Sequence, residues 1–144
     1  YYFCLMYVDI VKLIRDTANA VNPNGTFFFG RVSDATLSLG DKPFPQIHLY
    51  PFSVAPPDQR FSLDITDNVR IVFYLQDSPN TSDTDREIII NDADILQRAF
   101  RAELDETSAE YSKYLATPFF KEHNGITSGM VVTFALKNKS NPCD

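Results

Sequence analysis

Two histidines are the side chains of this sequence best suited to general acid–base catalysis. His48 lies in a short apolar segment, whereas His123 lies beside an Asn-Gly turn. Neither belongs to a local hydrolase signature such as Gly-x-Ser-x-Gly, in which a strand-to-helix turn presents the nucleophile. Because a catalytic base also needs a partner within hydrogen-bond reach, which no motif supplies, a structural role is favoured for both histidines.

Closely spaced aspartates raise the question of a metal site. Asp83 and Asp85 form one pair, and Asp92 and Asp94 form another. Neither pair matches the calcium-binding loop, which needs further oxygen ligands, a glycine and a later glutamate at fixed positions. We therefore interpret these carboxylates as helix charges, which are favourable near the positive N-terminal end of the helix dipole.

The remaining composition argues against several other kinds of site. The five glycines form neither a phosphate-binding loop nor a dinucleotide-binding motif, and Cys4 and Cys143 lack the spacing of a disulfide framework or a zinc site. The formal net charge of −6 argues against direct nucleic-acid binding, which gathers cations on one surface. No apolar run reaches the length of about 18 residues that spans a bilayer. We expect a soluble protein without metal, cofactor or membrane partner.

Hydrophobic periodicity predicts a helix followed by three strands. Residues 6–21 carry apolar side chains at helical spacing and end at an Asn-Pro-Asn-Gly sequence with strong turn preference. Residues 26–32 are aromatic and β-branched, as strands are. Residues 46–52 and residues 61–75 alternate between two faces, which predicts a short strand and then a long one.

A second helix and a final strand follow. The polar residues 77–85 are expected to form an exposed loop, and Thr84 with Glu87 has the spacing of a capping box at the start of the helix. The helix itself is indicated by apolar residues at intervals of three and four: Ile89, Ala93, Leu96, Phe100 and Leu104. Residues 106–124 are expected to be an irregular connection, and residues 126–136 a long strand with one buried face.

Strands that cluster between two helices favour an α+β fold over a parallel βαβ winding. The order α-β-β-β-α-β predicts an antiparallel or mixed sheet with two helices packed on one face. With 144 residues the chain suits one globular domain, which we place at residues 6–137. Residues 1–5 are then an N-terminal extension of uncertain status, and residues 138–144 are a C-terminal tail.

Aromatic residues are more numerous than one face of a small core absorbs. Three groups stand out along the chain: Phe27, Phe28 and Phe29, then Tyr111 and Tyr114, then Phe119 and Phe120. Each of these residues alone is best explained by core burial, but together they indicate a subunit interface, where aromatics are enriched. We therefore predict a protein that assembles with other subunits and is not an enzyme.

Several strings, in their order along the chain, resemble the tail terminator proteins of long-tailed bacteriophages. These strings are Gly25-Thr26-Phe27-Phe28-Phe29-Gly30-Arg31, Phe44-Pro45-Gln46-Ile47-His48-Leu49-Tyr50, Val72-Phe73-Tyr74-Leu75 and Met130-Val131-Val132-Thr133-Phe134. Together with the two predicted helices, they extend the resemblance over most of the chain. Residues 106–124 and the N-terminal extension have no matching segment, and none of the strings is a catalytic motif.

The resemblance implies a structural protein of the virion tail and neck, assembled in the host cytoplasm. In that family a homohexameric ring caps the tail tube and joins it to a neck or head-completion protein. Such a ring needs heterologous interfaces, in which one surface of a subunit meets a different surface of the next. The sheet edges, Arg31 and the acidic residues Asp77, Asp83 and Asp85 are then candidate contacts.

Three alternative functions remain open from the sequence. Another phage neck or head-completion subunit would form a ring of different symmetry. A small metal-dependent hydrolase or nuclease would use Asp83, Asp85 and His123. A secreted binding domain would carry glycans at three sequons, which begin at Asn24, Asn80 and Asn138.

Overall fold

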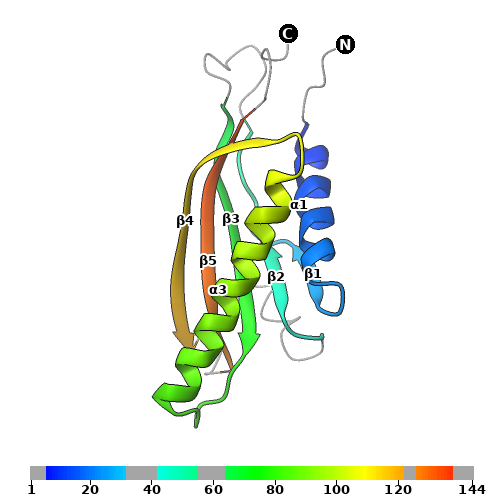
Figure 1. Cartoon of the computed structure of the whole chain (residues 1–144). Helices are drawn as coiled ribbons and strands as arrows, with labels where there is room; N and C mark the ends of the chain where they lie inside the picture. The colour runs from blue at the N-terminus through cyan, green and yellow to red at the C-terminus, as the bar shows by residue number, and fades with distance from the viewer. Residues whose placement is uncertain (1–5, 32–41, 55–63, 122–125, 138–144) are drawn as a thin grey trace.

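The computed structural model describes residues 6–31, 42–54, 64–121 and 126–137. Within these ranges the chain has two helices and a five-stranded mixed sheet, which confirms the predicted α+β fold (Figure 1). In chain order the elements are α1 (Tyr7–Val21), β1 (Thr26–Phe29), β2 (Gln46–Leu49), β3 (Asp64–Gln76), α3 (Asp83–Asp105), β4 (Glu110–Lys121) and β5 (Thr127–Lys137). Several residues considered above lie outside the described ranges: the two terminal segments with Cys4, Cys143 and Asn138, and also His123.

Strand β3 is the centre of a sheet whose order is β1-β2-β3-β5-β4. β1 and β2 run parallel, and the other three pairings are antiparallel. β1 and β2 are four residues each, shorter than predicted, because Gly30 and Pro51 follow them closely and favour turn or irregular backbone. β1 and β4 therefore form the two edges of the sheet.

Both helices cover the same face of the sheet (Figure 1). Ile10 and Ile14 of α1 are fully buried there, as are Phe100 and Leu104 of α3. The sheet contributes alternate residues of its strands to the same core: Ile47, Leu49, Ile71, Phe73, Val132 and Phe134. The apolar stripe predicted for the second helix is thus confirmed as its core-facing side. None of the described helices is long and apolar enough to cross a membrane.

The opposite face of the sheet carries a smaller, mostly aromatic cluster. Buried Val72 and Tyr74 form its centre, and five partly buried side chains pack against them: Phe28, Phe44, Tyr50, Phe119 and Val131. His48 also lies on this face, with its ring stacked on Phe28 at a centroid distance of 4.4 Å. The consecutive phenylalanines of β1 therefore contribute to both faces of the sheet: Phe27 packs on the helix-side core and Phe28 on the aromatic cluster.

A fifth strand, β4, occupies most of the segment that was expected to be irregular, and this expectation was wrong. Lys113 has φ 58°, and the pairing of β4 with β5 shifts its register between Ser112 and Leu115. This bulge changes the phase of the alternation, so the strand shows no continuous period of two in the sequence. Pro118 does not end the strand, because an edge strand tolerates the loss of one backbone N–H.

The start of α3 also differs from the prediction. Its N-cap is Ser82, whose Oγ accepts a hydrogen bond from the backbone N–H of Asp85 at 3.2 Å, and not Thr84. Thr84 lies exposed in the first helical turn. The preceding loop is therefore shorter than residues 77–85, and Asp83 and Asp85 belong to the helix. Their negative charges interact favourably with the positive N-terminal end of the helix dipole.

Candidate functional site

The side chains first considered for catalysis do not converge within the described residues. His48 is fully buried on the sheet face opposite the helices, and its Nε2 lies 2.6 Å from the carbonyl oxygen of Gly30. Asp83 and Asp85 lie exposed in the first turn of α3, on the other side of the sheet. In the four ranges that the structure describes, no group of three or more His, Cys, Asp and Glu side chains could hold a metal ion.

Asp77, a candidate contact residue, is buried and serves the fold. Its carboxylate accepts hydrogen bonds from Ser128 Oγ at 2.5 Å and from the backbone N–H of Ser78 at 2.6 Å. It also accepts a hydrogen bond from Arg86 Nε at 3.3 Å, and the Asp77 side chain is fully inaccessible to solvent. The carboxylate therefore joins the end of β3, the start of α3 and strand β5, and it cannot reach a neighbouring subunit. A polar loop in the sequence gives no sign of this burial.

The charge on Asp77 is favoured in spite of its burial. Burial raises the pKa of the Asp77 carboxyl, but hydrogen bonds from Ser128, Thr81, the Ser78 backbone and Arg86 outweigh it and lower the pKa to about 2. Arg86 is held in turn by the carbonyl oxygen of Thr81 at 2.7 Å and by the exposed carboxylate of Asp83. The loop before α3 is thus anchored by an ionised, fully hydrogen-bonded centre.

Tyr111 and Tyr114 attach the edge strand β4 to the helix layer. Both rings pack against Phe134, and the guanidinium of Arg101 lies 4.8 Å from the ring centroid of Tyr114. Arg101 Nε donates to the Tyr111 hydroxyl at 3.0 Å, and the Tyr114 hydroxyl lies 3.0 Å from Gln97 Oε1. Burial raises the pKa of Tyr114, so its hydroxyl stays protonated. The contacts of these two tyrosines are therefore mainly within the chain.

The other aromatic candidates divide between buried and exposed positions. Phe27 packs on the helix-side core, and Phe119 packs edge-on against Tyr74 on the opposite face. Phe29 and Phe120, in contrast, expose large parts of their rings on the two edge strands. Arg31 follows β1 and is also exposed. Of the predicted aromatic candidates, these two phenylalanines present the largest surface to a partner.

One group of exposed apolar side chains lies where α1 begins beside the end of β1. Val8 is 71% exposed and Phe29 is 38% exposed, and Met6 and Tyr7 add to the same group. The Tyr7 ring stacks on Phe52 at 4.3 Å and meets Phe29 edge-on at 6.0 Å, which fixes the position of these side chains. We call this the α1/β1 side of the molecule.

The other exposed large apolar side chains lie on α3 and on the edge strand β4. Leu115 points to the sheet face opposite the helices, because its neighbour Ala116 packs on the helix-side core. Ile88 and Ile95 are 56% and 57% exposed on α3, and Leu115 and Phe120 are 62% and 54% exposed on β4. We call this the α3/β4 side. Figure 1 shows β1 and β4 at opposite edges of the sheet, α1 over the β1 edge, and α3 crossing the sheet between α1 and β4. The exposed large apolar residues among those described all belong to one or the other of these sides.

Six of these exposed residues were not predicted as contacts from the sequence: Met6, Tyr7, Val8, Ile88, Ile95 and Leu115. Ile88 and Ile95 stand seven residues apart, two helical turns, beside the stripe that faces the core. These two isoleucines form a second apolar stripe, from which an exposed apolar helix face could have been predicted. Leu115 gave none, because the bulge at Lys113 hides its strand.

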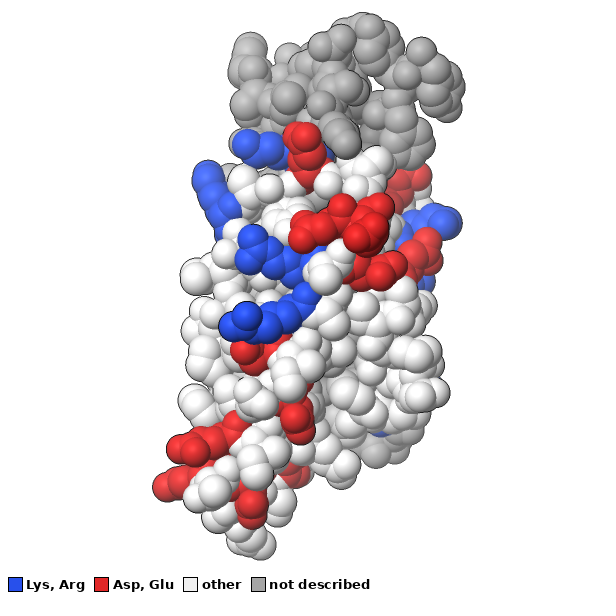
Figure 2. Space-filling model, in the orientation of Figure 1, with Lys and Arg blue, Asp and Glu red and all other residues white. Residues whose placement is uncertain are grey.

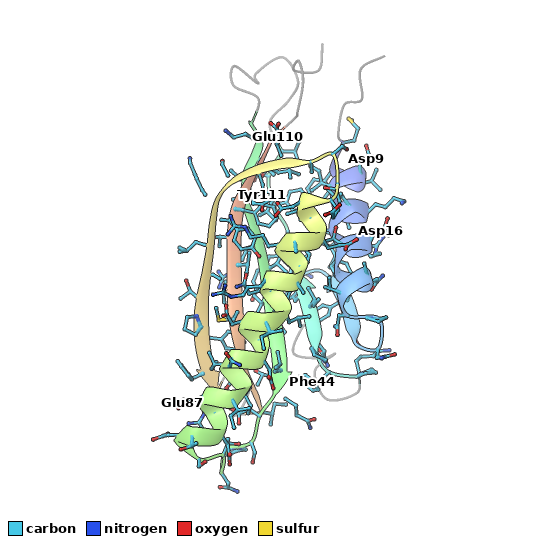
Figure 3. All side chains as sticks on the ribbon, viewed as in Figure 1. Asp9, Asp16, Phe44, Glu87, Glu110 and Tyr111 are labelled. Atoms are coloured by element: carbon cyan, nitrogen blue, oxygen red, sulfur yellow. The ribbon has the colours of Figure 1, made fainter. Side chains whose placement is uncertain are left out.

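The first turns of α3 are mainly acidic, whereas α1 carries two cations beside two acidic residues. Figure 2 shows acidic side chains gathered at the lower end of α3, where Asp83, Asp85 and Glu87 lie, and Figure 3 places Glu87 there. Figure 3 also places Asp9 and Asp16 on α1, on the other flank. Asp16 is paired there with Lys12 at 2.8 Å.

No protein-family model and no curated protein sequence matches this chain.

Proposed function

We propose that this chain is a structural subunit of a bacteriophage virion, similar to the tail terminators, which forms a homo-oligomeric ring. The ring would cap the tail tube and join it to a neck or head-completion protein. One observation carries the proposal: the exposed large apolar side chains of the described residues divide between two unlike sides, α1/β1 and α3/β4. Monomeric proteins rarely group such residues without an interaction partner.

Two unlike apolar sides suit the geometry of a closed ring. In a ring each subunit uses one surface toward the preceding copy and a different surface toward the following copy. A two-fold dimer, by comparison, uses one self-complementary surface and leaves the second apolar group exposed to water. The two sides of this chain differ in elements and in charge, so each can recognise the other and need not recognise itself.

The six-fold symmetry and the outer partners come from the resemblance in the sequence. A terminator ring has two faces beside its lateral contacts, one toward the tail tube and one toward the neck. The aromatic cluster on the sheet face opposite the helices is a surface separate from the helix layer, and we propose it as a contact for an axial partner. The proposed sites of action are the tail and neck of the virion.

Mass photometry and electron microscopy of the purified full-length chain test the proposal. We expect a closed ring, with six subunits, and immunogold label for this chain at the tail-to-head junction of the parent particle. A ring of another symmetry, labelled nearer the head, would instead support a different neck or head-completion subunit. A chain that stays monomeric at every concentration and in the presence of purified tail tubes would contradict the proposal.

A further inference from the structure

Helix α1 presents an uncovered stripe that combines one apolar residue with two cations. Val8, Lys12, Arg15 and Asn19 follow one another at intervals of four, three and four, which places them on one side of the helix, and all are exposed. The Arg15 guanidinium lies 5.7 Å from the ring centroid of Phe27 and forms no ion pair with a described residue. Among the described residues, Lys12 forms an ion pair only with Asp16, which is itself exposed.

Helix α3 presents an uncovered stripe with the same spacing and the opposite charge. Ile88, Asp92, Ile95, Ala99 and Ala102 follow at intervals of four, three, four and three, and all are exposed. Asp92 is the charged residue of this stripe. Asp85 and Glu87 flank its N-terminal end, and none of these three carboxylates forms an ion pair with a described residue. An exposed helix face with two isoleucines is costly unless another surface covers it.

The two stripes match in both spacing and charge. Val8 and Lys12 are separated by one helical turn, about 6 Å along the axis, and Ile88 and Asp92 have the same separation. When Val8 meets the isoleucines, Lys12 or Arg15 can therefore lie within reach of Asp92. Because Asp16 already shares the charge of Lys12, Arg15 is the cation that gains most from a new carboxylate partner.

We propose that the α3 stripe of one copy docks on the α1 stripe of the next copy, and that this helix–helix contact is the lateral interface of the ring. This inference rests on the proposed function and names the surfaces that the ring uses. Like pairings are disfavoured, since α3 against α3 would bring the acidic ends or Asp92 residues together. α1 against α1 would likewise oppose the cations Lys12 and Arg15.

Charge reversal with rescue is the first test. Asp92→Arg in the full chain, and separately the double variant Lys12→Glu with Arg15→Glu, should each raise the dissociation constant of assembly about tenfold or more in sedimentation velocity. Combining all three substitutions should restore assembly, because each interface again pairs opposite charges. Glu110→Arg, the same charge change on exposed β4, is the matched control and should leave assembly unchanged.

A mixing experiment then tests that the interface joins unlike surfaces. Val8→Asp spoils only the α1 stripe and Ile95→Asp only the α3 stripe, so each variant alone should be monomeric. Their mixture retains one intact pair of stripes and should form heterodimers but no larger ring. Thr117→Asp on β4 is the control for added charge at an exposed site, and circular dichroism confirms that each variant remains folded.

The outcomes separate the interface from the function. If wild-type rings form and the reversals or the aspartate variants leave them intact, the α1–α3 contact is overturned while the ring function stands. If the triple variant fails to recover while its fold is retained, the charge pairing is overturned. If the wild-type chain never assembles, both the ring function and this interface are overturned.

Discussion

Replacing Asp77 should destabilise the fold more than replacing any exposed acidic residue of α3. The carboxylate accepts hydrogen bonds at 2.5 Å from Ser128, 2.6 Å from Ser78 and 3.3 Å from Arg86, among others, and its side chain is inaccessible to solvent. Its pKa is lowered from 3.8 to about 2, which corresponds to about 2.5 kcal/mol of folding stability at neutral pH. We expect Asp77→Asn to lose about 2 to 3 kcal/mol at pH 7, because the neutral amide keeps the shape and removes the charge.

The loss of unfolding free energy in Asp77→Asn should become smaller as the pH falls. The pKa of Asp77 is lower in the folded chain than its ordinary value of 3.8, so the ionised carboxylate stabilises the fold above that value. This contribution is lost as the pH falls toward about 2. By the same relation, the difference between wild type and Asp77→Asn should shrink to about half its neutral value at pH 3.

Urea unfolding followed by circular dichroism at pH 7 and at pH 3 measures both quantities. Asp85→Asn is the matched control, because Asp85 has the same side chain and lies exposed in the first turn of α3. This substitution should lower the free energy of unfolding by less than about 0.5 kcal/mol. The reasoning would be refuted by an Asp77→Asn cost as small as that of the control. It would also be refuted by a cost that is the same at both pH values.

Four further substitutions test other parts of the structure by the same unfolding measurement. Ser82→Ala should cost about 1 kcal/mol and Thr84→Ala less than half of that, and the reverse order would restore Thr84 as the cap. Gly129→Ala should cost about 3 kcal/mol or more, since its Cβ would lie 1.8 Å from the carbonyl oxygen of Phe73; a neutral effect would contradict this close approach. Tyr114→Phe should lower the free energy of unfolding by about 1 kcal/mol, because the hydrogen bond to Gln97 on α3 is lost; an unchanged stability would contradict this contribution.

The elements that the sequence predicted are those whose signal is local. Ala93, Phe100 and Leu104 repeat with the period of a helix and are buried on one side of α3. In β5, Val132, Phe134 and Leu136 alternate and all three reach the helix-side core. Thr127, Ser128 and Ala135 are buried as well, so the prediction of one buried face for this strand was wrong. A pattern within ten or so residues suffices for such elements, because the residues that face the core repeat with the period of the helix or strand.

The features that escaped prediction depend on contacts between distant residues. Asp77 meets Ser128 from another strand, and nothing near Asp77 in the sequence reports that partner. Tyr111 and Tyr114 pack on Phe134 although they flank the bulge at Lys113, where the period of two is interrupted. The exposure of Ile88 and Ile95 likewise depends on which stripe of α3 packs on the sheet. Because the stripe with Ala93, Phe100 and Leu104 is buried, the two isoleucines face outward.

The edge strand β4 has a consequence for the chain before it meets any partner. An open strand edge offers unpaired backbone groups to any other extended chain, which is a common start of aggregation. In β4 the left-handed residue Lys113 and the imino acid Pro118 leave only Tyr114 to Thr117 as an uninterrupted run between them. At this edge, the stretch on which another extended chain could pair without interruption is therefore only four residues long.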